Sequence, residues 1–217
     1  MELLINGPNE GPVYILAHGA GADMNSDFLT QVAEGLALKG IRVVRFNFPY
    51  MIKSAHDGKR RPPDRAPKLL AAYQDVIEKI MQQTSKPLVI GGKSMGGRIA
   101  TMLTEQLSLG ENDILGTACI GFPFHAPKKE SKDRLDYLVH ITKPVLIFQG
   151  TRDVMGNKEE VTEYQKLKRI DCAIKIYWLE DGDHDLKPRK ASGFNHQQHI
   201  NNTIEQLAEY VLTLHKQ

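Results

Sequence analysis

Short runs of apolar residues alternate along the chain with longer segments in which apolar residues recur every three or four positions. The short runs have the length and composition that are typical of buried strands. They span residues 13–16, 41–46, 88–90, 115–120, 145–148 and 174–178. In the last run apolar and polar residues alternate, which favours a position nearer the edge of a sheet.

The longer segments carry the apolar stripe of amphipathic helices. They cover residues 28–37, 69–80 and 200–211, and Gly40 is suited to end the first of them. Strand–helix alternation of this kind predicts an α/β fold, in which a doubly wound, mostly parallel sheet has helices on both faces. No internal repeat or linker divides the sequence, so residues 1–217 are expected to form a single domain.

Two segments, residues 47–67 and 122–132, fit neither pattern. Both follow predicted strands, and in an open parallel sheet the loops at the carboxyl ends of the strands build the active site. Only about two dozen residues separate the strand that ends near 120 from the one that begins near 145. A lid of several helices does not fit there, so we expect an open cleft or one covered by loops.

Composition indicates a globular protein and narrows the classes of function. The 217 residues are 41% hydrophobic and 25% charged, which excludes a disordered chain, a collagen-like fibre and a disulfide scaffold. The formal net charge is only +2, and the basic cluster at residues 59–61 lacks interleaved aromatic residues, so we expect no nucleic-acid partner. Cys119 and Cys172 lie in apolar runs and are predicted to be buried thiols rather than a disulfide or a metal site.

The sequence also lacks the features of a membrane or exported protein. No apolar stretch approaches the ~18 residues that a membrane helix requires. The first residues contain no basic segment followed by an apolar one, so no signal peptide is predicted. We therefore expect a cytoplasmic protein with no membrane partner, no metal and no cofactor, whereas the oligomeric state is not predicted.

The strongest local motif follows the predicted strand at 88–90. There, Gly92-x-Ser94-x-Gly96 leads into a segment of helical period, which is the strand–turn–helix context of a nucleophile elbow. The serine of an elbow occupies a strained turn, and side chains at the two glycine positions would collide with the adjoining strand and helix. An ordinary glycine-rich turn and a phosphate-binding loop are the alternatives, but the Walker pattern is absent.

A serine hydroxyl becomes a useful nucleophile when a base accepts its proton and an acid orients that base. In elbow enzymes the chain order is serine, then aspartate or glutamate, then histidine. Asp153 follows the strand at 145–148 and His184 follows the strand at 174–178, so both stand past carboxyl ends. Singly, Asp153 fits a helix cap and His184 a solvated loop. Their order and positions together favour an acid and a base for Ser94.

An oxyanion hole needs two backbone N–H groups, one from the residue after the serine and one from the loop after an earlier strand. Met95 provides the first of these. The second lies in the loop that follows the strand at 13–16, where Ala20 is favoured and Gly21 is the alternative. His18 and Gly19 of the same loop are expected to shape the turn.

These motifs together resemble those of α/β-hydrolases over nearly the whole chain. The segments HGAGADM at 18–24, GKSMGGR at 92–98 and GFPFH at 121–125 resemble more narrowly a group of small, lidless predicted hydrolases. That group is similar to dienelactone hydrolases and to the hydrolase-like domain of an NSL chromatin-complex subunit. Dienelactone hydrolases use a cysteine nucleophile, so their particular chemistry does not transfer to a chain with Ser94.

The resemblance implies that Ser94, Asp153 and His184 form a catalytic triad, with Met95 and Ala20 as oxyanion donors. We therefore expect a serine hydrolase that cleaves a small-molecule ester or thioester through an acyl-enzyme. A peptidase or amidase remains an alternative, as does an interaction module that keeps the fold without turnover.

Basic residues gather in segments that are expected to lie beside this site. Residues 53–68 contain six basic and two acidic side chains, and residues 128–134 contain four and two. Lys187, Arg189 and Lys190 follow the histidine. Loops of one charge sign concentrate ligands of the opposite sign, which predicts an anionic substrate, unless these side chains point away into solvent. The residues expected to bind substrate are Lys93, His125, Arg60 and Arg61.

Overall fold

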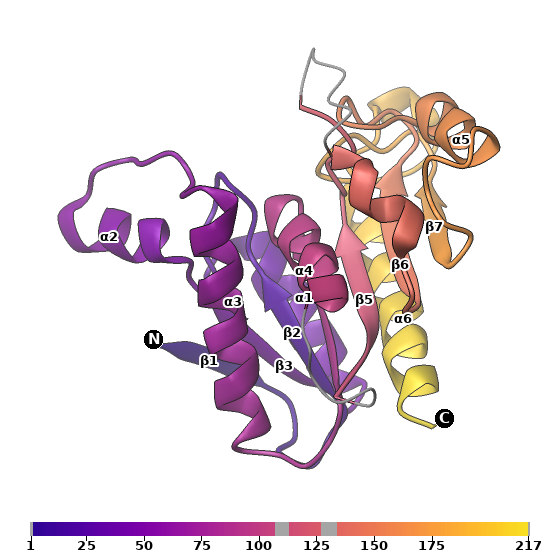
Figure 1. Cartoon of the computed structure of the whole chain (residues 1–217). Coiled ribbons are helices and arrows are strands. Elements are labelled where there is room, and N and C mark those ends of the chain that lie inside the picture. The colour runs from indigo at the N-terminus through magenta and orange to yellow at the C-terminus, as the bar shows by residue number, and fades with distance from the viewer. Residues whose placement is uncertain (1, 107–112, 127–133, 217) are drawn as a thin grey trace.

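The computed structural model describes residues 2–106, 113–126 and 134–216. Its centre is a sheet whose strands are β1 (Leu3–Asn6), β2 (Val13–Ala17), β3 (Arg42–Phe46), β4 (Leu88–Lys93), β5 (Ile114–Ile120), β6 (Val145–Gly150) and β7 (Ile174–Leu179). Their order across the sheet is β1-β3-β2-β4-β5-β6-β7 (Figure 1). Strand β1 is antiparallel to β3, and the other neighbours are parallel.

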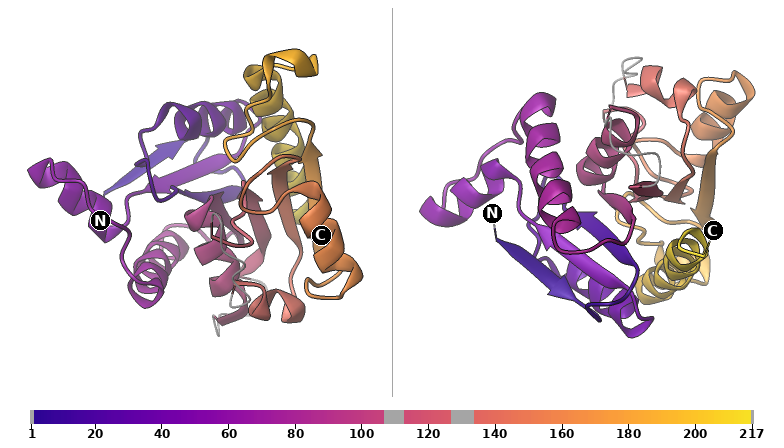
Figure 2. Two further views of the ribbon diagram at one scale, coloured as in Figure 1. Left: turned by 90° about the horizontal axis from the view of Figure 1, so that it is seen from above. Right: turned by 60° about the horizontal axis from the view of Figure 1, so that its bottom comes forward.

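Helices cover both faces of this sheet, which confirms the predicted fold class. They are α1 (Asp27–Leu38), α2 (Pro49–Asp57), α3 (Ala66–Met81), α4 (Met95–Gln106), α5 (Lys158–Lys166) and α6 (His196–Leu214), with short 3-10 helices η2 (Asp136–His140) and η3 (Lys190–Ser192). Helices α1 and α6 lie together on one face, and α3 and α4 lie on the other (Figures 1 and 2).

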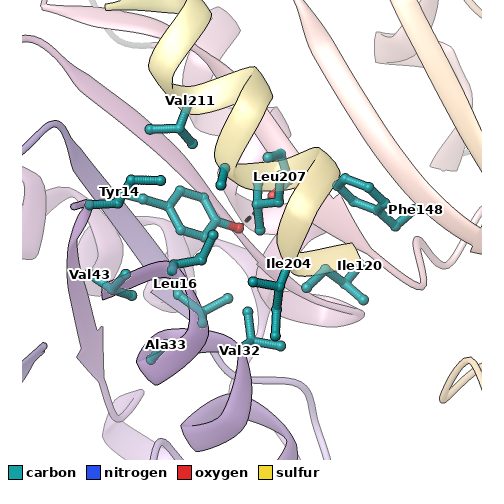
Figure 3. Close-up of a cluster of buried hydrophobic side chains, with 14 of the residues drawn as sticks. Tyr14, Leu16, Val32, Ala33, Val43, Ile120, Phe148, Ile204, Leu207 and Val211 are labelled. Atoms are coloured by element: carbon teal, nitrogen blue, oxygen red, sulfur yellow. Dashed lines mark hydrogen bonds between the residues drawn. The ribbon is translucent and has the colours of Figure 1, made fainter. Parts of the chain in front are cut away.

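The face under α1 and α6 is closed by apolar side chains from both layers. Tyr14 and Leu16 of β2 are fully buried, and they lie against α6, from which Ile204 and Leu207 point toward the sheet (Figure 3). The Tyr14 hydroxyl donates a hydrogen bond to the carbonyl oxygen of Ala118 in β5, 2.9 Å away. A buried hydroxyl therefore keeps a partner inside an otherwise apolar layer.

The opposite face is closed by α3 and α4. Strand β2 alternates its side chains, so Val13, Ile15 and Ala17 pack on this side. Tyr73 of α3 is fully buried, and its hydroxyl donates to the carbonyl oxygens of β2 and β4. Because both faces are covered, the central strands are apolar on both sides, which is why they stood out as continuous apolar runs.

Besides the two 3-10 helices, one strand and two α-helices of the described chain were not predicted from the pattern. Strand β1 has only four residues at the edge of the sheet, and α2 and α5 each bury a single side chain, Tyr50 and Val161 respectively. Such short or exposed elements lack the apolar period that sequence reasoning depends on. The edge position predicted for the last strand, β7, is confirmed.

The two cysteines differ in exposure. Cys119 is fully buried, as predicted, but Cys172 is exposed, so the prediction for Cys172 is wrong. Cys172 precedes β7 in a connecting turn rather than lying within the strand. Within the described residues, no helix is both long and apolar enough to cross a membrane. Those residues also contain no cluster of three or more His, Cys, Asp or Glu side chains suited to a metal ion.

Candidate active site

Ser94 stands in the turn between β4 and α4 with a backbone φ of +51°. Residues other than glycine rarely adopt this left-handed backbone conformation, so the turn is strained and requires support from its surroundings. The Ser94 N–H donates to the carbonyl oxygen of Ile120 in β5, 2.9 Å away, and the Ser94 carbonyl accepts from the N–H of Arg98. These two bonds fix the serine between the sheet and the first turn of α4.

The glycines on either side of Ser94 are required by close contacts with backbone. A Cβ atom at Gly92 would lie 2.5 Å from the carbonyl oxygen of Ala17, and one at Gly96 would lie 2.6 Å from that of His18. The collision expected from the sequence motif is therefore present at both positions. Strand β2 lies so close to the elbow that no side chain fits between them.

The three residues expected to form a triad lie within hydrogen-bonding distance of one another. His184 Nε2 is 2.9 Å from Ser94 Oγ, and His184 Nδ1 is 2.8 Å from Asp153 Oδ2. A carboxylate oxygen can only accept, so the ring proton lies on Nδ1 and Nε2 is left to accept from the serine hydroxyl. The strands β4, β6 and β7 bring the three side chains to one edge of the sheet.

Asp153 is completely buried, and its carboxylate has partners besides the histidine. The Gln149 side-chain amide donates to Asp153 Oδ2 at 2.9 Å, and the Met155 N–H donates to Oδ1 at 2.8 Å. Gln149 also exchanges hydrogen bonds with the backbone of Phe122. Sequence reasoning missed Gln149, although a polar residue at the end of the apolar run of β6 was the available signal.

Lys93 lines the site, but its ammonium group is engaged by the protein. Its Nζ donates to the carbonyl oxygen of His184 at 2.8 Å and lies 3.1 Å from Asp185 Oδ1. Burial lowers the pKa of Lys93, and the charge of Asp185 opposes that shift. Lys93 was expected to bind substrate; in the structure it connects the serine turn to the histidine loop.

The candidate oxyanion donors lie on both sides of Ser94. Met95 begins α4, and Gly19, Ala20 and Gly21 line the cleft that contains Ser94. A Cβ atom at Gly19 would lie 3.5 Å from the Cβ of Ser94, so this loop passes directly beside the serine. Among the described residues, no acceptor is bonded to the N–H groups of Ala20, Gly21 and Met95.

The cleft beside Ser94 has a volume of about 1080 Å³. It lies between the loop after β2, the first turn of α1 and the first turn of α6, with Phe28, Met155 and Ile200 among its apolar side chains. Two aspartates and two lysines also line the cleft, namely Asp27, Asp185, Lys93 and Lys187. A cleft of this volume with apolar side chains on its wall is typical of a binding site for a small molecule.

Three residues expected to bind substrate are not brought to this cleft. Arg60 and Arg61 do not line the cleft, and the segment that follows α2 lies at the end of the molecule where β1 is, away from α5 and β7 (Figures 1 and 2). The guanidinium group of Arg61 pairs with the carboxylate of Asp57. His125 is 7% exposed and lies 3.4 Å from Glu160 Oε2. None of the three lines the cleft beside Ser94, so the position of all three differs from the expectation.

The other basic residues expected near the site do not all line the cleft. Lys187 lines the cleft, whereas Arg189 is paired with the carboxylate of Asp181. Hydrogen bonds from Arg189 lower the pKa of Asp181 to about 2. The expected basic segment at 128–133 lies outside the described residues. Of the three residues Lys187, Arg189 and Lys190, Lys187 is the one that lines the cleft.

Comparison with known proteins gives a family and several similar structures. The profile of a family described as an alpha/beta hydrolase domain matches residues 10–212. Est1E from Butyrivibrio proteoclasticus, solved with ferulic acid bound, has 15% sequence identity and a TM-score of 0.71, covering 100% of this chain and 96% of its own. A dienelactone hydrolase from Anabaena variabilis has 15% identity and a TM-score of 0.72, covering 97% and 90%. A serine hydrolase without a lid from Xanthomonas campestris has 16% identity and a TM-score of 0.64, covering 98% and 86%.

Proposed function

This chain belongs to the alpha/beta hydrolase domain family, and on that premise we propose that it is a serine hydrolase acting on an ester or thioester. The observation that carries the proposal is the continuous hydrogen-bonded chain from Ser94 through His184 to the buried Asp153. A structural serine has no need of an imidazole acceptor that is itself oriented by a carboxylate, whereas a nucleophile needs both.

The reaction begins when Ser94 Oγ attacks the carbonyl carbon of the substrate and His184 Nε2 accepts the hydroxyl proton. The carbonyl oxygen becomes an oxyanion, and the N–H groups of Met95 and Ala20 donate hydrogen bonds to it. Asp153 holds the ring by its Nδ1 proton and stabilises the imidazolium that forms. The N-terminus of α4 adds a favourable dipole at the same place.

Collapse of this intermediate breaks the bond to the leaving group and completes the acyl-enzyme. The imidazolium gives its proton to the departing alkoxide or thiolate, which leaves as an alcohol or a thiol. Water then enters, His184 accepts one of its protons, and the hydroxide attacks the acyl carbon bound to Ser94. The second collapse returns the proton to Ser94 Oγ and releases a carboxylic acid.

The cleft supports a small molecule as the substrate. Phe28, Met155 and Ile200 provide apolar surface beside the reacting serine, and the loop at 19–21 closes one side. An acyl or alcohol group that covers these side chains would bury apolar area and gain about 25 cal/mol for each Å² removed from water. Substrates with an apolar acyl chain of several carbons should therefore have a higher kcat/KM than acetyl esters.

The proposal is tested with a fluorophosphonate probe and a panel of p-nitrophenyl esters and acyl thioesters. Wild-type protein should be labelled and should hydrolyse at least one member of the panel, and Ser94→Ala should lose both properties. Ser192→Ala is the matched control, because its hydroxyl in η3 bonds to the backbone of Arg189 and Phe194, does not line the cleft, and should be irrelevant to labelling. Folded wild-type protein that is neither labelled nor active would favour an interaction module instead.

A further inference from the structure

Tyr50 contacts the backbone of the candidate oxyanion loop from the side away from the solvent. It is the second residue of α2, it is 2% exposed, and its hydroxyl lies 3.3 Å from the carbonyl oxygen of Gly19 and 3.2 Å from that of Ala20. A single hydroxyl proton therefore serves two consecutive carbonyl groups. No step of the mechanism above uses this side chain.

His18 supports the same loop from a second direction. Its Nε2 accepts the N–H of Phe48 at 3.0 Å, which leaves the ring proton on Nδ1. That proton is donated to the carbonyl oxygen of Gly19, 2.6 Å away. Because His18 already supplies a donor to Gly19, the Tyr50 hydroxyl is available for Ala20. Burial lowers the pKa of His18, so the ring remains in this neutral form.

The direction of a carbonyl group decides the direction of the next N–H group. A peptide unit is planar, and in the trans form its C=O and N–H point to opposite sides. No described peptide bond is cis. Fixing the carbonyls of Gly19 and Ala20 on the Tyr50 side therefore turns the N–H groups of Ala20 and Gly21 to the other side. Gly19, Ala20 and Gly21 line the cleft together with Ser94, and these N–H groups have no acceptor among the described residues.

We propose that Tyr50 is a positioning residue for the oxyanion hole, because its hydroxyl holds the 19–21 loop in the orientation that presents a backbone N–H to the oxyanion formed at Ser94. This inference rests on the proposed serine-hydrolase function. Tyr50 reaches the reaction only through the peptide units that it holds. Removing the Tyr50 hydroxyl should raise the energy of the transition state more than that of the bound substrate, because the oxyanion forms only in the transition state.

Tyr50 should act as a donor over the whole range in which the enzyme is assayed. Burial, with a further contribution from the charge of Asp64, raises the pKa of Tyr50 to about 12. The hydroxyl therefore keeps its proton at neutral and mildly alkaline pH. A variant without the hydroxyl should lose the same factor in rate at each pH, whereas the loss of a proton-transferring group would change the shape of the pH profile.

The test compares Tyr50→Phe with Tyr14→Phe in the full chain. Tyr50→Phe keeps the aromatic ring, which packs edge-on beside the ring of His18, and removes only the hydroxyl. Tyr14→Phe removes an equally buried hydroxyl that donates to a backbone carbonyl in the core under α6, so it measures the cost of losing such a bond away from the loop. Each variant is assayed for kcat and KM on the best ester of the panel from pH 6 to 9, and for unfolding by urea.

Tyr50→Phe should lower kcat by a factor on the order of 10 to 100, below the loss caused by deleting an oxyanion donor outright, with KM nearly unchanged. The binding of a boronic acid that forms a tetrahedral adduct with Ser94 should weaken by a similar factor. Tyr14→Phe should lose stability but keep kcat. Equal kcat in Tyr50→Phe and wild type would overturn the inference and leave the proposed function standing. An inactive, unlabelled wild type would overturn both.

Discussion

The side-chain nitrogen of Lys93 lies 2.8 Å from the backbone carbonyl oxygen of His184. The residue before the proposed nucleophile is thus hydrogen-bonded to the residue proposed as its base. Lys93 is the last residue of β4 and His184 lies in the loop after β7, 91 positions further along the chain. The bond fixes the backbone of the histidine loop relative to the serine turn, while Asp153 fixes only the ring.

Replacing Lys93 with methionine should therefore reduce turnover more than it reduces stability. The methionine fills most of the same space but cannot donate to the His184 carbonyl, so the imidazole loses its backbone support. A small displacement of a catalytic group is costly, and we expect kcat to fall by about 10- to 100-fold. Steady-state kinetics measure this directly. Asp185→Asn is the control: it removes the ion pair but keeps the Lys93–His184 bond, and an equal loss there would assign the effect to the charge instead.

The same substitution should change how stability depends on pH. Burial lowers the pKa of Lys93 below the value of 10.5 for an exposed lysine. Between these two pKa values the unfolded chain binds a proton that the folded protein does not, so the free energy of unfolding of the wild type rises with pH. Lys93→Met lacks this contribution, and any stability advantage of the variant should shrink as the pH approaches 10.5. Urea unfolding at several pH values above 8 checks it; parallel curves for the two proteins would contradict the assignment.

Gln149 orients the acid of the triad in the way that Lys93 orients the base. Gln149→Met preserves side-chain length but removes one of the donors to Asp153, which keeps Met155 and His184, and leaves the backbone N–H and C=O of Phe122 without their Gln149 partner. Leaving buried polar groups unpaired costs about 1–3 kcal/mol of stability. We expect that loss in urea unfolding, together with a fall in kcat of about tenfold as Asp153 gains freedom. Unchanged kcat in a destabilised variant would limit Gln149 to a structural role.

The nucleophile elbow could be predicted from the sequence because its structural requirements are local. Gly92, Ser94 and Gly96 stand at fixed spacing, and the steric reasons for that spacing hold wherever a strand turns sharply into a helix. The positions of Asp153 and His184 followed from a rule of equal generality, since parallel strands end at the same edge of the sheet. No pairing between distant side chains had to be known for either step.

The groups that support the site could not be found in this way. Lys93 was predicted to bind substrate because it precedes Ser94 in the sequence. Adjacency in the sequence does not predict which partner the end of a long side chain contacts. Tyr50 acts on backbone 31 positions away in the sequence, and Gln149 joins Asp153, four positions further on, to the backbone of Phe122, 27 positions back. Arg60 and Arg61 were placed at the site because their segment follows a strand, yet β2 separates that strand, β3, from the serine strand β4. The order of strands across a sheet is set by tertiary packing.

Gly96 offers a direct test of the close contact between the elbow and β2. In Gly96→Ala the new Cβ would stand 2.6 Å from the carbonyl oxygen of His18, and backbone would have to move. We expect about 1–3 kcal/mol of lost stability and little labelling by a fluorophosphonate. In Gly35→Ala the Cβ meets side-chain atoms of Ile204 rather than backbone, the nearest at 2.7 Å, so a smaller loss is expected there. Equal losses in urea unfolding would contradict this account.

The charge preference of the enzyme should follow the side chains that line the cleft rather than the charge of the nearby loops. Lys93 and Lys187 line it together with Asp27 and Asp185, and Lys93 is already paired with Asp185. The basic residues between α2 and α3 lie elsewhere, so the anionic preference expected from the sequence loses its largest contribution. We expect kcat/KM for a carboxylate-bearing ester and for its neutral isostere to be nearly equal at low and at high salt.

A matched pair of variants separates the two sources of charge. Asp27→Asn should raise the relative kcat/KM of the anionic ester at low salt, because the remaining cleft carboxylate, Asp185, is already paired with Lys93 and leaves Lys187 unopposed. Salt should screen most of that gain. Arg60→Ala, beyond the reach of the cleft, should leave the ratio unchanged. The opposite result would be a wild type that prefers the anionic ester and loses that preference in Arg60→Ala. In that case the basic segment between α2 and α3 attracts the substrate through its electrostatic potential, and the charges in the cleft do not select the substrate.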